Sequence, residues 1–163
     1  MKAISIFISL CFWTYFSYSQ NTLNDTAIVL TSEQVKLSYS PTDLFSSVSI
    51  ATGKFLDGQK GIKFFLLSKP RQATPVIMVD NIILQTSANK LVTLNNPYKD
   101  TIYLLSDGGL SLTSIHIVDK SKCDILKENL ITAIVLIVDN KQVLINLRKK
   151  SQLKFKALLN ETL

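Results

Sequence analysis

The 163-residue sequence is poor in the residues that mark fibrous, disordered and disulfide-rich proteins. It contains 5 glycines, 4 prolines and 2 cysteines. Such low glycine and proline contents exclude a collagen-like chain and a Pro/Gly-rich disordered chain. Hydrophobic residues make up 47% of the chain, which also excludes a wholly disordered protein. We therefore expect one domain that buries a sizeable core without metals or disulfides.

The chain has one histidine, His116, and this limits the chemistry available to it. A zinc site needs three or four Cys, His or carboxylate ligands, and no Asp-x-Asp-x-Asp-Gly run suggests a calcium loop. We therefore expect no metal and no cofactor. A nucleophilic site would have to combine His116 with Ser114, on the same strand face, or with Cys123. Because no Gly-x-Ser-x-Gly elbow is present, a small hydrolase using His116 is an alternative only.

Aspartates at the ends of predicted strands are the remaining catalytic candidates. A pair of carboxylates can support glycoside hydrolysis. The candidates are Asp57, Asp80, Asp100, Asp107, Asp119 and Asp139. Each lies beside Gly, Asn, Lys or Thr, where an aspartate commonly shapes a turn. The sequence therefore favours a turn role and predicts no catalytic residue.

Residues 1–19 have the pattern of a signal peptide. Lys2 precedes the apolar run Ala3–Phe16, and the small residues Ser17 and Ser19 follow it. This order predicts export to the periplasm or the medium, with cleavage after Ser19. The apolar run is shorter than the roughly 20 residues of a membrane-spanning helix, so no permanent span is expected after cleavage. A membrane anchor and a lipid on Cys11 are the alternatives.

Removal of this leader would leave Cys123 as the only cysteine. A single cysteine cannot form an internal disulfide, so an oxidising compartment would be tolerated but not used for stability. We expect Cys123 to be buried, because unpaired cysteines are among the most buried residues.

The sequence after the leader alternates apolar and polar residues in the manner of strands. Residues 20–46 are polar and poorly defined, with short strands expected near 28–30 and 35–39. Residues 47–163 are expected to form a single β-rich domain. Its predicted strands cover 47–50, 62–67, 76–79, 82–86, 91–94, 101–105, 110–118, 131–138 and 142–147. A bulge or turn is expected at Asp80-Asn81, and a four-residue hairpin loop at 87–90.

Two helices are expected near the C-terminus. Ser121–Asn129 should form one, with Ser121 as its cap and Asp124 three residues later. Leu153–Ala157 alternates like a strand, but its Leu, Lys and Ala content favours a short helix. The fold predicted from all elements is mainly β: an antiparallel β-sandwich or open barrel with one or two short helices near the C-terminus.

A group of motifs in residues 100–160 resembles small exported bacterial proteins of uncharacterised function. The motifs are Asp-Gly-Gly-Leu-Ser-Leu at 107–112, a short Leu-Lys helix, the strand LITAIVLIV and a basic Lys-Lys-Ser segment. The resemblance implies export, and it implies no activity, ligand or catalytic residue.

A basic cluster near the C-terminus is the sharpest charge feature. Five positive residues fall within nine positions without an acid: Arg148, Lys149, Lys150, Lys154 and Lys156. They could contact an anionic surface such as lipid headgroups or acidic glycans. Nucleic acid is not expected for an exported chain without an RNA-binding aromatic motif. The alternative is a solvated edge that discourages aggregation.

The sequence thus predicts an exported, non-catalytic binding or structural module of unknown ligand. Its expected partner is an anionic envelope component or another exported protein. The other alternative, beside the hydrolase, is a carrier of an apolar ligand in a β-barrel cavity. Ile62–Leu67 and Ile131–Val138 motivate that alternative, because they are apolar on both faces.

Overall fold

The computed structural model describes residues 28–40, 42, 44–69, 79–96, 101–106, 108–138 and 141–163. The predicted signal peptide, with Cys11 and the cleavage site after Ser19, lies outside these residues, as do Asp100, Asp107 and Asp139. Within the described ranges, no helix is both long and apolar enough to cross a bilayer.

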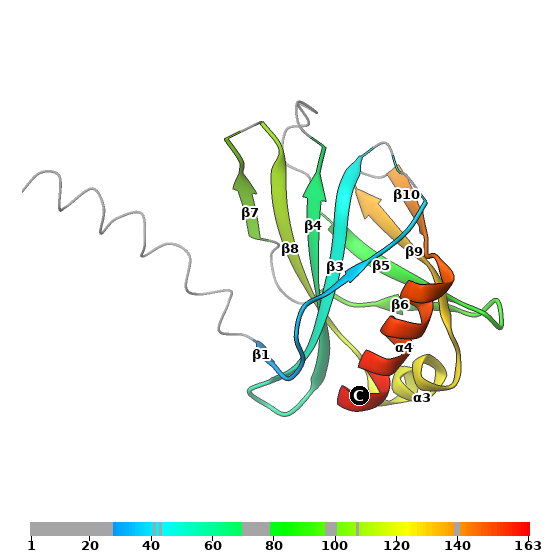
Figure 1. The fold of residues 1–163 in the computed structure, drawn as a ribbon. Helices are drawn as coiled ribbons and strands as arrows, with labels where there is room; N and C mark the ends of the chain where they lie inside the picture. Colours follow the sequence, from blue (N-terminus) through cyan, green and yellow to red (C-terminus); the bar gives the residue numbers. More distant parts are fainter. Residues whose placement is uncertain are drawn as a thin grey trace, which may run out of the picture.

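The fold is mainly β, as predicted, and its larger sheet has six antiparallel strands. The strand order is β1-β3-β4-β8-β7, and β2 pairs with β3 further along the same edge as β1. The bounds are Ile28–Leu30 (β1), Val35–Leu37 (β2), Phe45–Phe55 (β3), Lys60–Ser68 (β4), Thr101–Leu104 (β7) and Leu110–Ile117 (β8). The sheet curls into half of a barrel (Figure 1).

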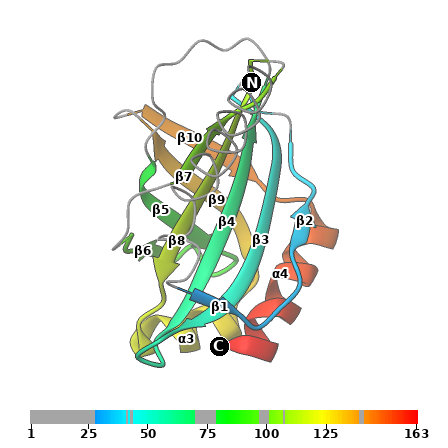
Figure 2. The same ribbon diagram turned by 90° about the vertical axis from the view of Figure 1, so that its left-hand side faces the viewer.

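The smaller sheet has four antiparallel strands in the order β10-β9-β5-β6 and lies behind the larger one (Figure 2). Its strands are Val79–Thr86 (β5), Leu91–Leu94 (β6), Ile131–Val138 (β9) and Lys141–Asn146 (β10). The register shifts between Val79 and Asn81, where the sequence predicted a bulge or turn. The predicted hairpin loop is also present, and Asn89 adopts a φ of 57° there, which asparagine tolerates.

In the part of the chain that the structure describes, two main-chain junctions connect the sheets at their margins. On one side Tyr39 pairs with Leu147, and on the other Asn95 pairs with Ile117. The amide of Ile117 donates to the carbonyl of Asn95 at 3.0 Å. These junctions turn two facing sheets into a partly closed barrel, so the structure combines the two predicted architectures.

The core lies between the sheets. Alternate residues of β4, including Ile62 and Phe64, point inward and belong to one continuous apolar cluster with Ile134 and Leu136 of β9. Each large apolar side chain buried in this way contributes about 1.5–3 kcal/mol of transfer free energy. The outward side of β4 is also largely covered, since Gly61 and Lys63 are buried. The strand is therefore largely covered on both faces, although Lys63 on its outward side is charged.

The two helices in the described part of the chain close one end of the barrel (Figure 1). The first, α3, spans Lys120–Glu128, close to the prediction. Its predicted cap is wrong: the N-cap is Asp119, which makes no side-chain capping bond. The carboxylate of Asp119 instead pairs with Lys122 at 2.8 Å.

The second helix, α4, spans Lys149–Thr162 and is longer than the short helix predicted. Its buried residues include Ser151, Phe155 and Leu159, four residues apart, and they form the stripe that faces the core. This helical spacing overrides the two-residue alternation of the Lys-Phe-Lys segment.

The Ser151 hydroxyl links the start of α4 to the residue that follows β2, and removal of this hydroxyl should destabilise the fold. The Ser151 hydroxyl accepts a hydrogen bond of 2.6 Å from the amide of Ser38, and the Ser38 carbonyl accepts one of 2.9 Å from the amide of Arg148. We expect Ser151→Ala to lower the free energy of unfolding in urea by about 1 kcal/mol. Ser121→Ala, which removes an exposed helical hydroxyl in α3, is the control. Equal losses in both variants would contradict a special role for Ser151.

Candidate functional site

A cleft of about 370 Å³ opens between the end of β2, the chain that follows it and the start of α4. Figure 2 shows β2 running beside the beginning of this helix. Three cationic residues from three separate segments line the cleft. They are Lys36 in β2, Lys69 just after β4, and Arg148 just before α4. None of the described residues that line it is acidic.

The walls of the cleft are held in place by hydrogen bonds to the main chain. The Thr42 hydroxyl donates to the carbonyl of Phe45 at 3.1 Å and accepts from the Phe45 amide at 3.0 Å. The Tyr39 hydroxyl donates to the same carbonyl at 3.3 Å, and that of Ser46 donates to the Leu67 carbonyl at 3.1 Å. Because these three hydroxyl hydrogens are already used, an anion in the cleft would meet the three cations and Ser38, which also lines the cleft.

Among the residues that the structure describes, no carboxylate forms an ion pair with Lys36, Lys69 or Arg148. Within the part of the chain that the structure describes, the only ion pair joins Lys122 to Asp119, far from the cleft in sequence and on α3. Lys36 and Arg148 are exposed, and Lys69 is half-buried. Burial raises the pKa of Tyr39, so its phenol stays neutral and adds no negative charge. The cleft therefore presents three cations to whatever enters it.

The structure divides the basic cluster that the sequence singled out. Arg148 lines the cleft, and Lys149 and Lys150 are exposed in the first turn of α4 beside it. Lys154 is exposed about one turn further along the helix. Lys156 lies apart, since its ammonium group donates to the carbonyl of Glu128 at 2.8 Å, at the end of α3.

Sequence reasoning missed Lys36 and Lys69. Lys36 is a solitary lysine in a strand-like segment, and Lys69, which has Arg71 two positions further on, stands at the start of a predicted loop. The two join Arg148 only because β2 and β4 both pair with β3, and because Tyr39 pairs with Leu147. No local signal in the sequence could have grouped these residues.

The buried pair of Ser114 and His116 is the second arrangement of interest. Ser114 Oγ lies 2.7 Å from His116 Nε2, on the inner face of β8. Asn96 Nδ2 donates to Ser114 Oγ at 3.2 Å, which leaves the serine hydrogen for the imidazole. Both residues are 0% exposed, and the His116 ring packs edge-on against Phe64 at 5.5 Å.

The environment of His116 favours its neutral form. Burial lowers its pKa to about 4, although a main-chain interaction with Leu94 works in the opposite direction. A Ser–His pair of this geometry could activate a serine nucleophile, but only if a substrate reached it. Because neither side chain is exposed, the pair is positioned to tie β8 to the chain that follows β6.

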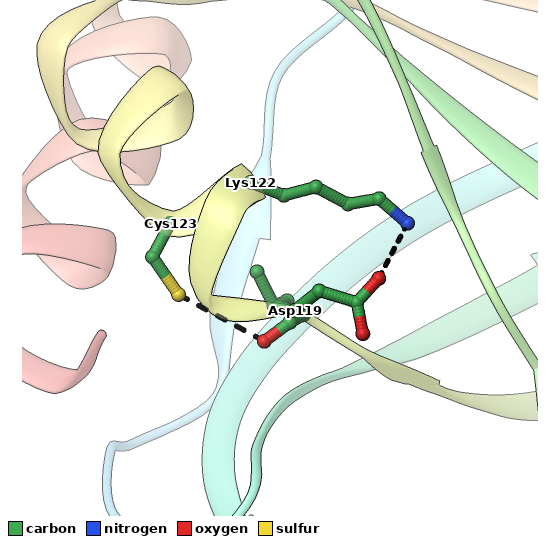
Figure 3. A network of polar contacts seen from close by, with 4 residues as sticks. Asp119, Lys122 and Cys123 are labelled. Carbon is green, nitrogen blue, oxygen red and sulfur yellow. Dashed lines mark hydrogen bonds and ion pairs between the residues drawn. The ribbon is translucent and has the colours of Figure 1, made fainter.

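A second cleft, of about 470 Å³, lies at the start of α3. It mixes cations such as Lys60 and Lys127 with acids such as Asp124. Cys123 also lines it and is buried, as predicted. Figure 3 shows its thiol directed at the carbonyl of Val118, 3.8 Å away. Burial raises the pKa of Cys123, so the thiol is protonated at neutral pH and is a poor nucleophile.

Asp57 and Asp119 make local contacts within the fold. Asp57 accepts a hydrogen bond of 3.0 Å from the amide of Gln59, which confirms the predicted turn role. Asp119 is engaged with Lys122, and Asp80 lies within β5. Among the described residues, no three His, Cys, Asp or Glu side chains gather in a way that could hold a metal.

Comparison of the chain with protein-family models, with curated proteins and with solved structures gives no match. The suggested kinship with small exported bacterial proteins therefore stays a prediction. The function has to be inferred from the surfaces of this molecule, among which the cleft lined by Lys36, Lys69 and Arg148 has the most distinctive chemistry.

The buried His116 should make the fold sensitive to acid. Its pKa rises from about 4 in the folded chain to an ordinary value near 6.5 on unfolding. The unfolded state therefore binds the proton first, and stability is lost as the pH falls from about 6.5 to 4. The loss should approach about 3 kcal/mol, measured by urea unfolding at pH 7 and pH 4. In His116→Gln the same pH change should cost less, and an identical loss in both proteins would contradict this account.

Proposed function

We propose that the protein is an exported, non-catalytic binding module that recognises an anionic component of the cell envelope. The observation that supports this most strongly is the convergence of Lys36, Lys69 and Arg148 on one cleft whose described lining residues include no acid. Lys149 and Lys150 extend the positive surface along the exposed start of α4. Such a concentration of one sign of charge attracts ligands of the opposite sign and speeds their encounter.

The predicted export supports an anionic partner from the cell envelope. The signal-peptide pattern of residues 1–19 would bring the chain to a compartment rich in lipid headgroups and acidic glycans. The mature chain would carry one cysteine, and its buried Cys123 would need no disulfide partner there. An anionic envelope component is therefore the ligand class that agrees with both the predicted export and the positive charge of the cleft.

The two alternative functions have less support. For a hydrolase, Ser114 and His116 have suitable spacing, but both are fully buried, and the Cys123 thiol is protonated. For an apolar carrier, the space between the sheets would have to hold ligand. That space contains packed side chains, among them the fully buried Phe64 and Phe155. The surface clefts are thus the more accessible places for a ligand.

The proposal predicts charge-dependent retention on anionic surfaces. The mature protein should bind phosphatidylcholine vesicles that contain phosphatidylglycerol, or an immobilised acidic polysaccharide, and high salt should release it. Replacing Arg148, Lys149 and Lys150 together by Gln should lower the affinity about tenfold or more. Co-sedimentation measures the vesicle arm, and elution in a salt gradient measures the polysaccharide arm.

A matched triple variant distinguishes the effect of the basic surface from the effect of net charge. Lys54, Lys90 and Lys120 are exposed and lie outside the basic surface, so their replacement by Gln changes the net charge equally. This variant should keep most of the affinity. Equal losses in the two triple variants, or no retention of the unmodified protein on either surface, would contradict the proposed function.

A further inference from the structure

We propose that the cleft holds a single compact, multiply charged group, a phosphate or sulfate monoester, between Lys36, Lys69 and Arg148. This inference rests on the proposed function and names the chemistry of its ligand. It differs from general attraction to a negative surface, because it places one defined anionic group in one defined site.

The geometry of the cleft supports a specific site. Its three cations come from three separate segments, namely β2, the residue after β4 and the residue before α4, and all three line the same open cleft. An arginine guanidinium can bind two oxygens of a phosphate or sulfate with parallel N–H groups, and a lysine adds a compact point charge. Two lysines and one arginine thus suit a group with several anionic oxygens better than a single carboxylate.

The beginning of α4 carries an electrostatic imbalance that such a group would relieve. Helices usually begin with Ser, Thr, Asp or Asn as a cap, and they favour acids in the first turn because the N-terminus is partly positive. Here the N-cap is Arg148, it makes no side-chain capping bond, and the first turn has no acid. Lys149 and Lys150 follow instead. An anion beside Arg148 would supply the negative charge that this helix start lacks.

The size of the cleft leaves room for more than the anionic group. Its volume of about 370 Å³ falls at the small end of ordinary ligand pockets. Tyr39, half-buried in its wall, offers an aromatic surface and a neutral hydroxyl beside the cations. A glycerol or a sugar that carries the phosphate or sulfate would occupy this part. The cleft at α3 lacks this character, because Asp119 and Asp124 line it together with its lysines.

The test uses the mature protein and four probes: inorganic phosphate, inorganic sulfate, glycerol phosphate and a hexose phosphate. Each is titrated against sodium chloride of equal ionic strength, with thermal unfolding and calorimetry as the two readouts. We expect a saturable rise in the melting temperature with at least one probe, and no such rise with chloride. Preference for glycerol phosphate would indicate a lipid headgroup as the source, and preference for hexose phosphate a glycan.

Two substitutions in the cleft and one control outside it test the assignment. Lys69→Gln and Arg148→Gln should each weaken binding of the preferred probe about tenfold. Lys120→Gln, which removes a cation from the cleft at α3, should leave its affinity unchanged. Loss of affinity in all three variants to the same extent would overturn the assignment, because it would reflect net charge alone.

Arg148→Ser tests the role of the helix start. Serine is a good N-cap, so this variant should melt at a higher temperature than the unmodified protein in chloride, and the probe should stabilise it less. An unchanged response to the probe would overturn the role of Arg148. If the unmodified protein is retained on anionic surfaces but shows no saturable response to any probe, this inference fails and the proposed function stands. If retention is absent as well, both fail.

Discussion

The two main-chain junctions between the sheets determine where the polar chemistry of this protein lies. The pairing of Tyr39 with Leu147 brings the end of β2 to the start of α4, and the cationic cleft opens at that meeting point. The pairing of Asn95 with Ile117 brings Asn96 to Ser114 and His116. Elsewhere the sheets meet through apolar side chains. Both polar arrangements are thus consequences of how a partly closed barrel is joined at its margins.

The sequence located most of the described strands, because local alternation or a short apolar run marks them. Ile131–Val138 and the chain around Ile62–Leu67 are examples, and both form the strands expected of them. The strand β3 extends beyond the predicted 47–50 at both ends, and most of the predicted strand 76–79 lies outside the described residues. The C-terminal helix was harder, because Lys-Phe-Lys alternation imitates a strand within a longer helical stripe. The cap of α3 was mispredicted because Ser121 has a suitable side chain. The helix begins at Lys120, so Ser121 is its second residue and Asp119 is the cap.

The candidate site could be predicted only in part. Arg148, Lys149 and Lys150 are adjacent, so composition alone revealed them. Lys36 and Lys69 are remote from them and from each other in the sequence. They meet Arg148 through strand register and through the junction at Leu147, neither of which is encoded in a local pattern. The buried contact between Ser114 and His116 follows from their shared strand face, but its burial depends on Phe64 and on the chain after β6.

The isolation of the only histidine has a consequence for the environments in which the molecule can work. Histidine is the side chain whose ordinary titration falls between about pH 5 and 8. Here the imidazole of His116 is fully buried, and its pKa of about 4 keeps it uncharged above that pH. The histidine therefore contributes no change in surface charge between about pH 5 and 8. Under the proposed function, no histidine would change the charge of the binding surface over this range, so salt concentration rather than histidine protonation would control retention.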